Sequence, residues 1–356
     1  MSHFTASGRR PRIAGAAAAA VVALALSACS SSTPTVTSTT SSTTSAGTTT
    51  SSGTSSSDTA SATSSGTSSS APNLTTGTGN GVIDQAEYDS VIAGGPKADA
   101  AAVDASAWAK KIKDRGVLNT GGTDAGQLFS LLDPATGKLT GFDAGLAQLL
   151  SQYILGSPNI NLTVTTVDTR ETLIQNGTVD TVFATYSITP ARAQKVAFAG
   201  PYFISGAAIM VKADNTDITK VEDLAGKNVA TETNSTSATA LQDKVPTAVL
   251  QLYADDAACQ AAVQQGRADA YVLDQSILIS DAIANPAVKV VGEPFTVDPY
   301  GIGVTLDDPA AKAFVNTWLQ KIYDDGTWAK LWKATIGTVV SGDAPTPPKI
   351  GSVEGS

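Results

Sequence analysis

A short stretch of hydroxyl residues, proline and arginine follows an apolar run in this acidic chain. The segment "VDTVFATYSITPAR" contains Thr185 and Ser187 and ends in Arg192, with Pro190 two positions before the arginine. An arginine guanidinium presents a planar fork of N–H donors that matches a carboxylate. Because Pro190 restricts the backbone, we expect Arg192 to be held at a fixed distance beyond the end of a buried strand. The alternative is an ordinary surface arginine.

A second segment follows the same plan as the first. The stretches "RETLIQNGTVDTVFAT" and "CQAAVQQGRADAYVLD" both predict a helix, a glycine, an aspartate and then a strand. The first brings Thr185 to the carboxyl end of a strand, and the second brings Asp274 there; ligands of α/β sheets bind at such ends. Two similar halves facing one cleft would explain both. Alternatively, Asp274 caps the helix that follows it.

Composition excludes several classes of function. The chain has 356 residues, with 23 Lys+Arg and 32 Asp+Glu; three arginines and no acidic residues lie within residues 1–28, so the remainder carries 20 − 32 = −12. Bulk electrostatics therefore disfavour nucleic acid and anionic lipid as partners. The only histidine is His3, which excludes Ser-His-Asp and Cys-His catalysis and the common zinc sites from the rest of the chain. We expect no cofactor and no metal, whereas carboxylate chemistry stays open.

The N-terminus has the features of an export signal. Basic residues precede the apolar run Ile13–Leu26, which ends in "LSAC" at Cys29. The run is typical of a secretory signal and too short to span a membrane. The ending resembles a lipobox, which predicts a lipoprotein signal peptide over residues 1–28 and a lipid on Cys29 that holds the protein at the extracytoplasmic face of the cell membrane. The alternative is an ordinary signal peptide with an incidental cysteine.

The remaining chain divides by composition. Residues 29–81 are rich in Ser and Thr and predict a disordered tether. Residues 82–116 predict a helical extension that includes one helix over Ala98–Arg115. Strand and helix patterns then alternate to about residue 340, which predicts an α/β architecture with largely parallel sheets. Asp143 is the expected N-cap of one helix, and residues 179–187 are an expected buried strand. Residues 341–356 predict a flexible, Pro-rich tail.

Several motifs in succession resemble one protein family. The segments "DPATGKLTGFDAGLAQLL", "VEDLAGKNVA", "GEPFTVDPYGIGV" and "YDDGTWAKLWKATIG", together with the two stretches above, resemble the family 3 extracellular solute-binding proteins, and most closely the glutamate, aspartate and glutamine binders of high-GC Gram-positive bacteria. The resemblance implies a two-lobed, type II periplasmic-binding-protein-like fold with two hinge strands and a central ligand cleft. Lobe 1 would comprise residues 117–206 and 298–340, and lobe 2 residues 207–297.

The resemblance also implies roles for individual residues. Arg192, in "TPAR", would grip the α-carboxylate of an amino acid. Thr185 and Ser187 would supply a backbone carbonyl and a hydroxyl. Ser235 and Thr236, in "TNSTS", would bind the same carboxylate from lobe 2, although both could be plain turn residues.

Two further residues complete the site implied by the resemblance. Asp274 would bind the α-ammonium group, and Arg170 the side-chain carboxylate of an acidic ligand. Alternatively, Arg170 is a surface residue paired with Glu171 or Asp168. The chain departs from the family pattern in one respect, because Ala230 stands where close relatives have the cysteine that pairs with one like Cys259. We therefore expect Cys259 to be an unpaired, buried thiol.

The function implied is the binding of glutamate or aspartate, and possibly glutamine or asparagine, for delivery to an ABC permease in the membrane. We expect a monomer without enzymatic activity. One alternative is a lipoprotein that reports amino-acid availability to a membrane sensor, and a more distant one is a cleft enzyme of the dehydratase type. The same residues would serve transport and sensing, so the sequence leaves that choice open.

Overall fold

The computed structural model describes Leu74 and residues 81–356, which belong to a unit of residues 65–356. The expected signal peptide, the lipidation site Cys29 and nearly all of the expected tether lie outside the described residues. Among residues 81–356, none of the helices has both the length and the apolar character needed to cross a membrane.

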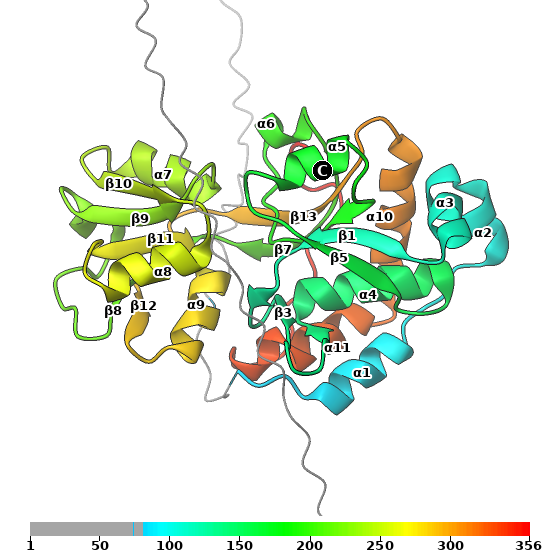
Figure 1. The fold of residues 1–356 in the computed structure, drawn as a ribbon, viewed down its shortest axis with the longest axis horizontal. Coiled ribbons are helices and arrows are strands. Elements are labelled where there is room, and N and C mark those ends of the chain that lie inside the picture. Colours follow the sequence, from blue (N-terminus) through cyan, green and yellow to red (C-terminus); the bar gives the residue numbers. More distant parts are fainter. Residues whose placement is uncertain (1–73, 75–80) are drawn as a thin grey trace, which may run out of the picture. The chain divides into compact units, whose positions relative to one another are not determined.

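Lobe 1 is built on a five-stranded sheet with the order β5-β1-β6-β13-β7 (Figure 1). Its strands are β1 (Leu118–Gly122), β5 (Ile160–Val164), β6 (Thr181–Val182), β7 (Ala197–Ser205) and β13 (Asp298–Val304). Its helices are α4 (Phe142–Leu155), α5 (Arg170–Gln175), α6 (Pro190–Ala193), α10 (Pro309–Asp324), α11 (Thr327–Ala334) and the 3-10 turn η2 (Ile336–Thr338). Trp318, Trp328 and Trp332 are buried in its main apolar core. A small sheet of β2 (Ala125–Gly126), β3 (Ser130–Leu132) and β4 (Leu139–Thr140) leads into α4.

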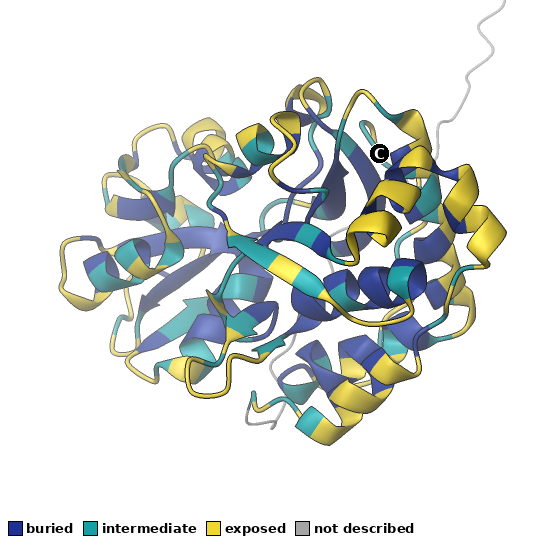
Figure 2. Ribbon diagram, turned by 45° about the vertical axis from the view of Figure 1, so that its right-hand side comes forward, coloured by how far each residue is buried: buried dark blue, intermediate teal, exposed yellow. Residues whose placement is uncertain are grey.

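Lobe 2 is built on a second five-stranded sheet with the order β10-β9-β11-β8-β12. The strands are β8 (Ala207–Lys212), β9 (Asn228–Glu232), β10 (Val249–Tyr253), β11 (Ala270–Asp274) and β12 (Val288–Val291). The helices are α7 (Thr236–Lys244), α8 (Asp256–Gln264), α9 (Gln275–Ala284) and the 3-10 turn η1 (Val221–Leu224). Two apolar clusters of lobe 2 fill the space between strands and helices, and Figure 2 shows buried residues along the strands and exposed residues on the outward sides of many helices.

The prediction of largely parallel sheets was wrong in part, because each five-stranded sheet contains as many antiparallel as parallel pairings. In lobe 1, β1 is parallel to β5 and β6, whereas β13 is antiparallel to β6 and β7. In lobe 2, β9 is parallel to β10 and β11, whereas β8 is antiparallel to β11 and β12. In the two five-stranded sheets the antiparallel pairings all involve β8 or β13, the strands in which the chain enters lobe 2 and returns to lobe 1, so they reflect the passage between lobes rather than a helix crossover.

The two chain segments that connect the lobes pack against each other at Gly206. Only this residue separates β7 from β8, and a Cβ atom there would collide with the carbonyl oxygen of Thr296 in the returning segment. Ala207 donates its N–H to the Thr296 hydroxyl at 2.6 Å, and Phe295 donates its N–H to the Ala207 carbonyl at 2.9 Å. Glycine is therefore required at this position for the two connections to pack closely.

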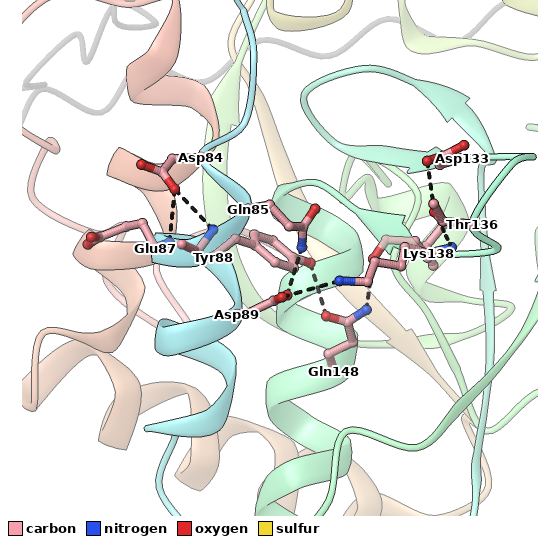
Figure 3. Close-up of polar contacts among 11 residues, drawn as sticks. Asp84, Gln85, Glu87, Tyr88, Asp89, Asp133, Thr136, Lys138 and Gln148 are labelled. Carbon is pink, nitrogen blue, oxygen red and sulfur yellow. Dashed lines mark hydrogen bonds and ion pairs between the residues drawn. The ribbon is translucent and has the colours of Figure 1, made fainter.

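The helical extension consists of three helices rather than the two expected. The segment expected as one helix over Ala98–Arg115 forms α2 (Ala100–Ala105) and α3 (Ala107–Arg115), because Ser106 leaves the helical conformation and its hydroxyl accepts the Ala109 N–H at 3.2 Å. α1 (Gln85–Ala93) packs on α4, and the Tyr88 hydroxyl hydrogen bonds with the Gln148 side chain at 3.1 Å (Figure 3). The extension is thus part of lobe 1.

The C-terminal tail, expected to be flexible, packs against lobe 1. The Gly351 N–H donates to the Gly200 carbonyl at 2.9 Å, and Val353 packs on the apolar cluster that includes Ile174 and Ile188. In Figure 1 the C-terminus lies beside α5 and α6. The tail therefore packs against the segment of lobe 1 that carries Arg192.

Candidate functional site

The candidate site lies where strands of both sheets end and their chains turn toward the other lobe. In lobe 1 these are the residues after β6 up to α6, and in lobe 2 the residues after β9 and β11. Direct hydrogen bonds join the two edges: the Asn234 side-chain amide donates to Asp168 at 2.6 Å, and the hydroxyls of Ser187 and Thr236 lie 3.4 Å apart. The two sets of residues expected from the sequence are thus brought together.

Arg192 is buried and hydrogen bonds to both edges. It lies in α6, which begins with Pro190 and is capped by the Thr189 hydroxyl, and it is only 8% exposed. One guanidinium nitrogen donates to the Ser187 carbonyl at 2.9 Å, and another donates to the Asn234 carbonyl of lobe 2 at 3.1 Å. The surface alternative for Arg192 is therefore wrong. Within the described residues the guanidinium has no carboxylate partner at ion-pair distance.

Arg170 is buried beside it, at 4% exposure, rather than on the helix surface. Its guanidinium donates to the Ala184 carbonyl at 3.0 Å and lies 3.9 Å above the centre of the Tyr186 ring, in a cation–π contact. Its buried Nε has no hydrogen-bond partner among the described residues. Burial, and next the nearby Arg192 charge, lower the pKa of Arg170 to about 10, so it stays positive at neutral pH.

The surface partners considered for Arg170 bond elsewhere. Asp168 accepts the Asn234 amide, and Glu171 pairs with Lys195 at 2.8 Å. The surface-pair alternative for Arg170 is therefore wrong.

Asp143 organises the segment that carries Thr185. Thr185 adopts a left-handed backbone with φ +44° and donates its N–H to the Asp143 carboxylate at 2.7 Å. The Tyr202 hydroxyl donates to the same carboxylate at 2.8 Å. Burial raises the pKa of Asp143 to about 7, against the effect of these two hydrogen bonds. The N-cap prediction for Asp143 was wrong, because α4 begins at Phe142 with Gly141 in the cap position.

The same turn explains why the expected strand over residues 179–187 is short. Only Thr181 and Val182 pair in β6, because the left-handed Thr185 turns the chain out of the sheet. Ser187 remains close enough to form an isolated bridge with Tyr300 of β13. This departure from the strand places the Ser187 carbonyl next to Arg192.

Ser235 and Thr236 begin α7 in lobe 2. The Ser235 hydroxyl caps the helix by accepting the Ala238 N–H at 3.0 Å, so Ser235 has a local structural role, as the turn-residue alternative expected. Thr236 occupies the first helical position and faces Ser187 of lobe 1 through its hydroxyl. The N-terminus of α7 therefore lies at the junction of the lobes, where helix N–H groups favour an anion.

Asp274 ends β11 at the cap position of α9, but its side chain makes no capping hydrogen bond. Instead its carboxylate accepts the Tyr300 hydroxyl at 2.8 Å and lies 3.5 Å from the Ser237 hydroxyl. The helix-cap alternative is therefore wrong. Burial, and next the charge of Asp298, raise the pKa of Asp274 to about 7.

Glu232 is an acidic residue of lobe 2 that the sequence analysis did not single out. It ends β9, three positions before Ser235, and is half-buried. Burial, and next Asp256, raise its pKa to about 8, while the Arg170 charge acts in the opposite sense. The available signal was an acidic residue at the end of a strand directly before "TNSTS".

Cys259 is an unpaired, buried thiol, as expected. It lies in one apolar cluster with Ala230, the residue found where relatives have its partner. Among the residues that the structure describes, no group of histidine, cysteine, aspartate and glutamate side chains could hold a metal ion.

Comparisons with known proteins show the family to which this chain is similar. The family model described as "Bacterial extracellular solute-binding proteins, family 3" matches residues 119–338. The chain is 36% identical over 212 residues to the glutamate-binding protein GluB of Corynebacterium efficiens, covering 56% of this chain and 72% of that protein. It is 33% identical over 227 residues to the ABC transporter glutamine-binding protein GlnH of Bacillus subtilis, covering 63% of this chain and 83% of that protein.

A solved structure supports the fold assignment. An ancestral arginine-binding protein bound to glutamine superposes with a TM-score of 0.59 and 32% sequence identity, covering 63% of this chain and 99% of that one. The expected two-lobed fold of the type II periplasmic binding proteins is confirmed.

Proposed function

Because the chain belongs to the family 3 bacterial extracellular solute-binding proteins, we propose that it binds glutamate or aspartate, or their amides, outside the cytoplasm and delivers them to an ABC importer. One observation carries the proposal: Arg192 is buried between the lobes and lacks a carboxylate partner among the described residues. A buried guanidinium without a counter-charge is unfavourable, and the carboxylate of an amino acid would supply one. The names of the glutamate- and glutamine-binding relatives support the ligand class.

The α-carboxylate would bind to Arg192 and to groups from both lobes. The hydroxyls of Ser187 and Thr236 lie on either side of the junction, and the start of α7 offers backbone N–H groups. Ser235 would contribute by capping α7, and Thr185, in the turn fixed by Asp143, would accept a hydrogen bond from the α-ammonium group with its carbonyl.

The α-ammonium group would bind to Asp274. In the absence of a ligand, burial keeps the pKa of Asp274 near 7, so part of the population is protonated at neutral pH. An ammonium group favours the ionised carboxylate, and binding near pH 7 should therefore release a proton from this residue.

The side chain of the ligand would be read by Arg170. Its buried Nε is an unused donor among the described residues, and the guanidinium is held in place by Ala184 and the Tyr186 ring. A carboxylate or amide oxygen is the chemical group that such a donor recognises.

The test is calorimetric titration of the lipid-free mature chain with the twenty amino acids, in wild type and in Arg192→Ala. Removing one partner of a buried charge pair costs about 3–5 kcal/mol, so the variant should bind at least about a hundredfold more weakly. Arg267→Ala, at an exposed arginine of lobe 2, is the matched control and should bind normally. An Arg192→Ala variant that folds and binds within tenfold of wild type contradicts the proposal.

A further inference from the structure

The helix that carries Arg192 is too short to hold its own position. α6 is a single turn of four residues, Pro190–Ala193. Within this turn the Thr189 hydroxyl accepts the Arg192 N–H at 3.2 Å, and the Thr189 carbonyl accepts the Ala193 N–H at 2.9 Å. A turn of this length is unstable in isolation, because it fixes several backbone angles for very few hydrogen bonds. The position of the Arg192 guanidinium therefore depends on what packs against α6.

Contact with lobe 2 supports α6 only while the lobes meet. The Arg192 guanidinium donates to the Ser187 carbonyl of lobe 1 at 2.9 Å and to the Asn234 carbonyl of lobe 2 at 3.1 Å. The bond to Asn234 is lost whenever the lobes separate, which they must do for a ligand to enter. Support that persists in the separated lobes has to come from lobe 1.

The end of the C-terminal tail packs directly on α6. A Cβ atom on Gly355 would lie 2.8 Å from the Cβ of Ala193, 3.3 Å from the Cγ2 of Ile188 and 3.5 Å from the Thr189 carbonyl oxygen. Gly355 also has a positive φ of +93°, which glycine adopts without strain. The tail thus touches both the cap and the last residue of α6, at a distance that leaves no space for a side chain.

The tail is itself anchored to lobe 1. Gly351 donates its N–H to the Gly200 carbonyl of β7 at 2.9 Å. Val353 packs on the apolar cluster that contains Ile188, the residue before the cap of α6. The Ser356 hydroxyl donates to the Val353 carbonyl at 2.7 Å and closes a turn. In Figure 1 the C-terminus accordingly lies beside α5 and α6. These contacts connect α6 through the tail to the sheet of lobe 1.

We propose that residues 350–356 are a positioning element of the ligand site, which holds α6 so that Arg192 stays aimed at the ligand α-carboxylate when the lobes separate. The inference rests on the amino-acid-binding function proposed above and adds a segment that acts through Arg192. A guanidinium fork matches a carboxylate in a defined geometry, so a displaced α6 would bind the ligand more weakly. If α6 occupied its binding position only about one tenth of the time, the affinity would fall about tenfold.

The experiment compares Gly355→Ala with the matched control Gly342→Ala in the lipid-free mature chain. Both glycines have a positive φ, +93° and +101°, so alanine brings similar backbone strain to each. At Gly355 the added methyl group meets Ala193 of α6. At Gly342, apart from the chain neighbours, no atom of the described residues lies within 4 Å of the added carbon.

Calorimetric titration should show that Gly355→Ala binds glutamate and glutamine about tenfold more weakly than wild type. The loss should be the same for both ligands, since both present an α-carboxylate to Arg192. Gly342→Ala should bind both ligands as wild type does.

Amide hydrogen exchange of the ligand-free protein separates positioning from a loss of overall stability. The N–H groups of Ala193 and Val196 donate to the carbonyls of Thr189 and Arg192, so they report on α6. They should exchange faster in Gly355→Ala than in wild type, whereas the amides of β9 in lobe 2 should keep their rates. A merely structural role of the tail would lower the urea midpoint and leave the affinity of the folded protein unchanged.

A chain that ends at Ser352 keeps the inference testable if Gly355→Ala does not fold, because it removes the contact with α6 instead of forcing a collision. It should show the same loss of affinity for both ligands. Wild-type affinity in either folded variant, or a loss confined to glutamate, overturns the positioning of Arg192 by the tail and leaves amino-acid binding intact. If the wild-type protein binds no amino acid, the proposed function fails and this inference falls with it.

Discussion

The buried carboxylate of Asp143 should make this protein less stable at pH 8 than at pH 4. The folded state raises the pKa of Asp143 to about 7, from an ordinary value of 3.8. Between these two values the folded protein holds a proton that the unfolded chain has lost, so the free energy of unfolding falls as pH rises. Each pH unit costs about 1.4 kcal/mol, and the window of about three units therefore costs on the order of 4 kcal/mol.

The variant Asp143→Asn isolates this contribution. An amide has the shape of the protonated carboxyl group: its oxygen can accept the Thr185 N–H, and its NH2 can donate to the Tyr202 hydroxyl oxygen. We expect wild type and variant to have similar stability at pH 4, and the variant to become the more stable of the two by a few kcal/mol at pH 8.

Urea denaturation of the ligand-free protein from pH 4 to pH 8 measures the difference. Asp214→Asn, at an exposed aspartate of lobe 2, is the control, and its difference from wild type should stay constant with pH. A difference between wild type and Asp143→Asn that is also constant over this range would show that Asp143 is not protonated in the folded state, and the argument from burial would be refuted.

Two other variants test the ligand side-chain contact and the anchor. Arg170→Ala should weaken the binding of glutamate more than that of glutamine, since Arg192 still holds the α-carboxylate of both. Equal losses of affinity for the two ligands, measured by calorimetry, would show that Arg170 does not contact the ligand side chain. Cys29→Ala, tested by cell fractionation, should release the protein to the medium, and continued membrane retention would exclude lipid on Cys29 as the anchor.

The periodic parts of the fold could be predicted from the sequence, because each depends on local patterns. The helices around Gly326 and the helix–glycine–strand units ending at Asp274 follow from apolar spacing and from glycine stops. The break at Ser106 was missed because a serine within an otherwise helical pattern can either continue the helix or cap the next one.

The inner parts of the site depend on contacts distant in sequence, and the sequence did not predict them. Asp143 accepts a hydrogen bond from the N–H of Thr185, which lies 42 positions away in the sequence. Thr185 has a left-handed backbone, which is uncommon for a β-branched residue. Glu232 is the last residue of β9, as the strand pattern predicts, but the charged groups near it belong to α8, α9 and lobe 1. The positions of Arg192 and Asp274 at strand ends followed from local patterns, but their roles toward a ligand came only from the family resemblance.

The charges of the site suggest why a ligand would hold the lobes together. Arg170 and Arg192 lie close enough for the charge of Arg192 to lower the pKa of Arg170, and among the described residues both guanidinium groups hydrogen bond only to carbonyls. The junction is held by Arg192 on the Asn234 carbonyl, the Asn234 amide on Asp168, and the Ser187–Thr236 pair. Each hydrogen bond of this kind contributes about 1 kcal/mol, or somewhat more where a charge takes part. The α-carboxylate of a ligand would bind to Arg192 of lobe 1 and to the start of α7 in lobe 2, so it would offset the repulsion between the arginines and add hydrogen bonds to both lobes at once. Because such bonds form only when the lobes meet, the ligand would bind that state more tightly and shift the population toward it.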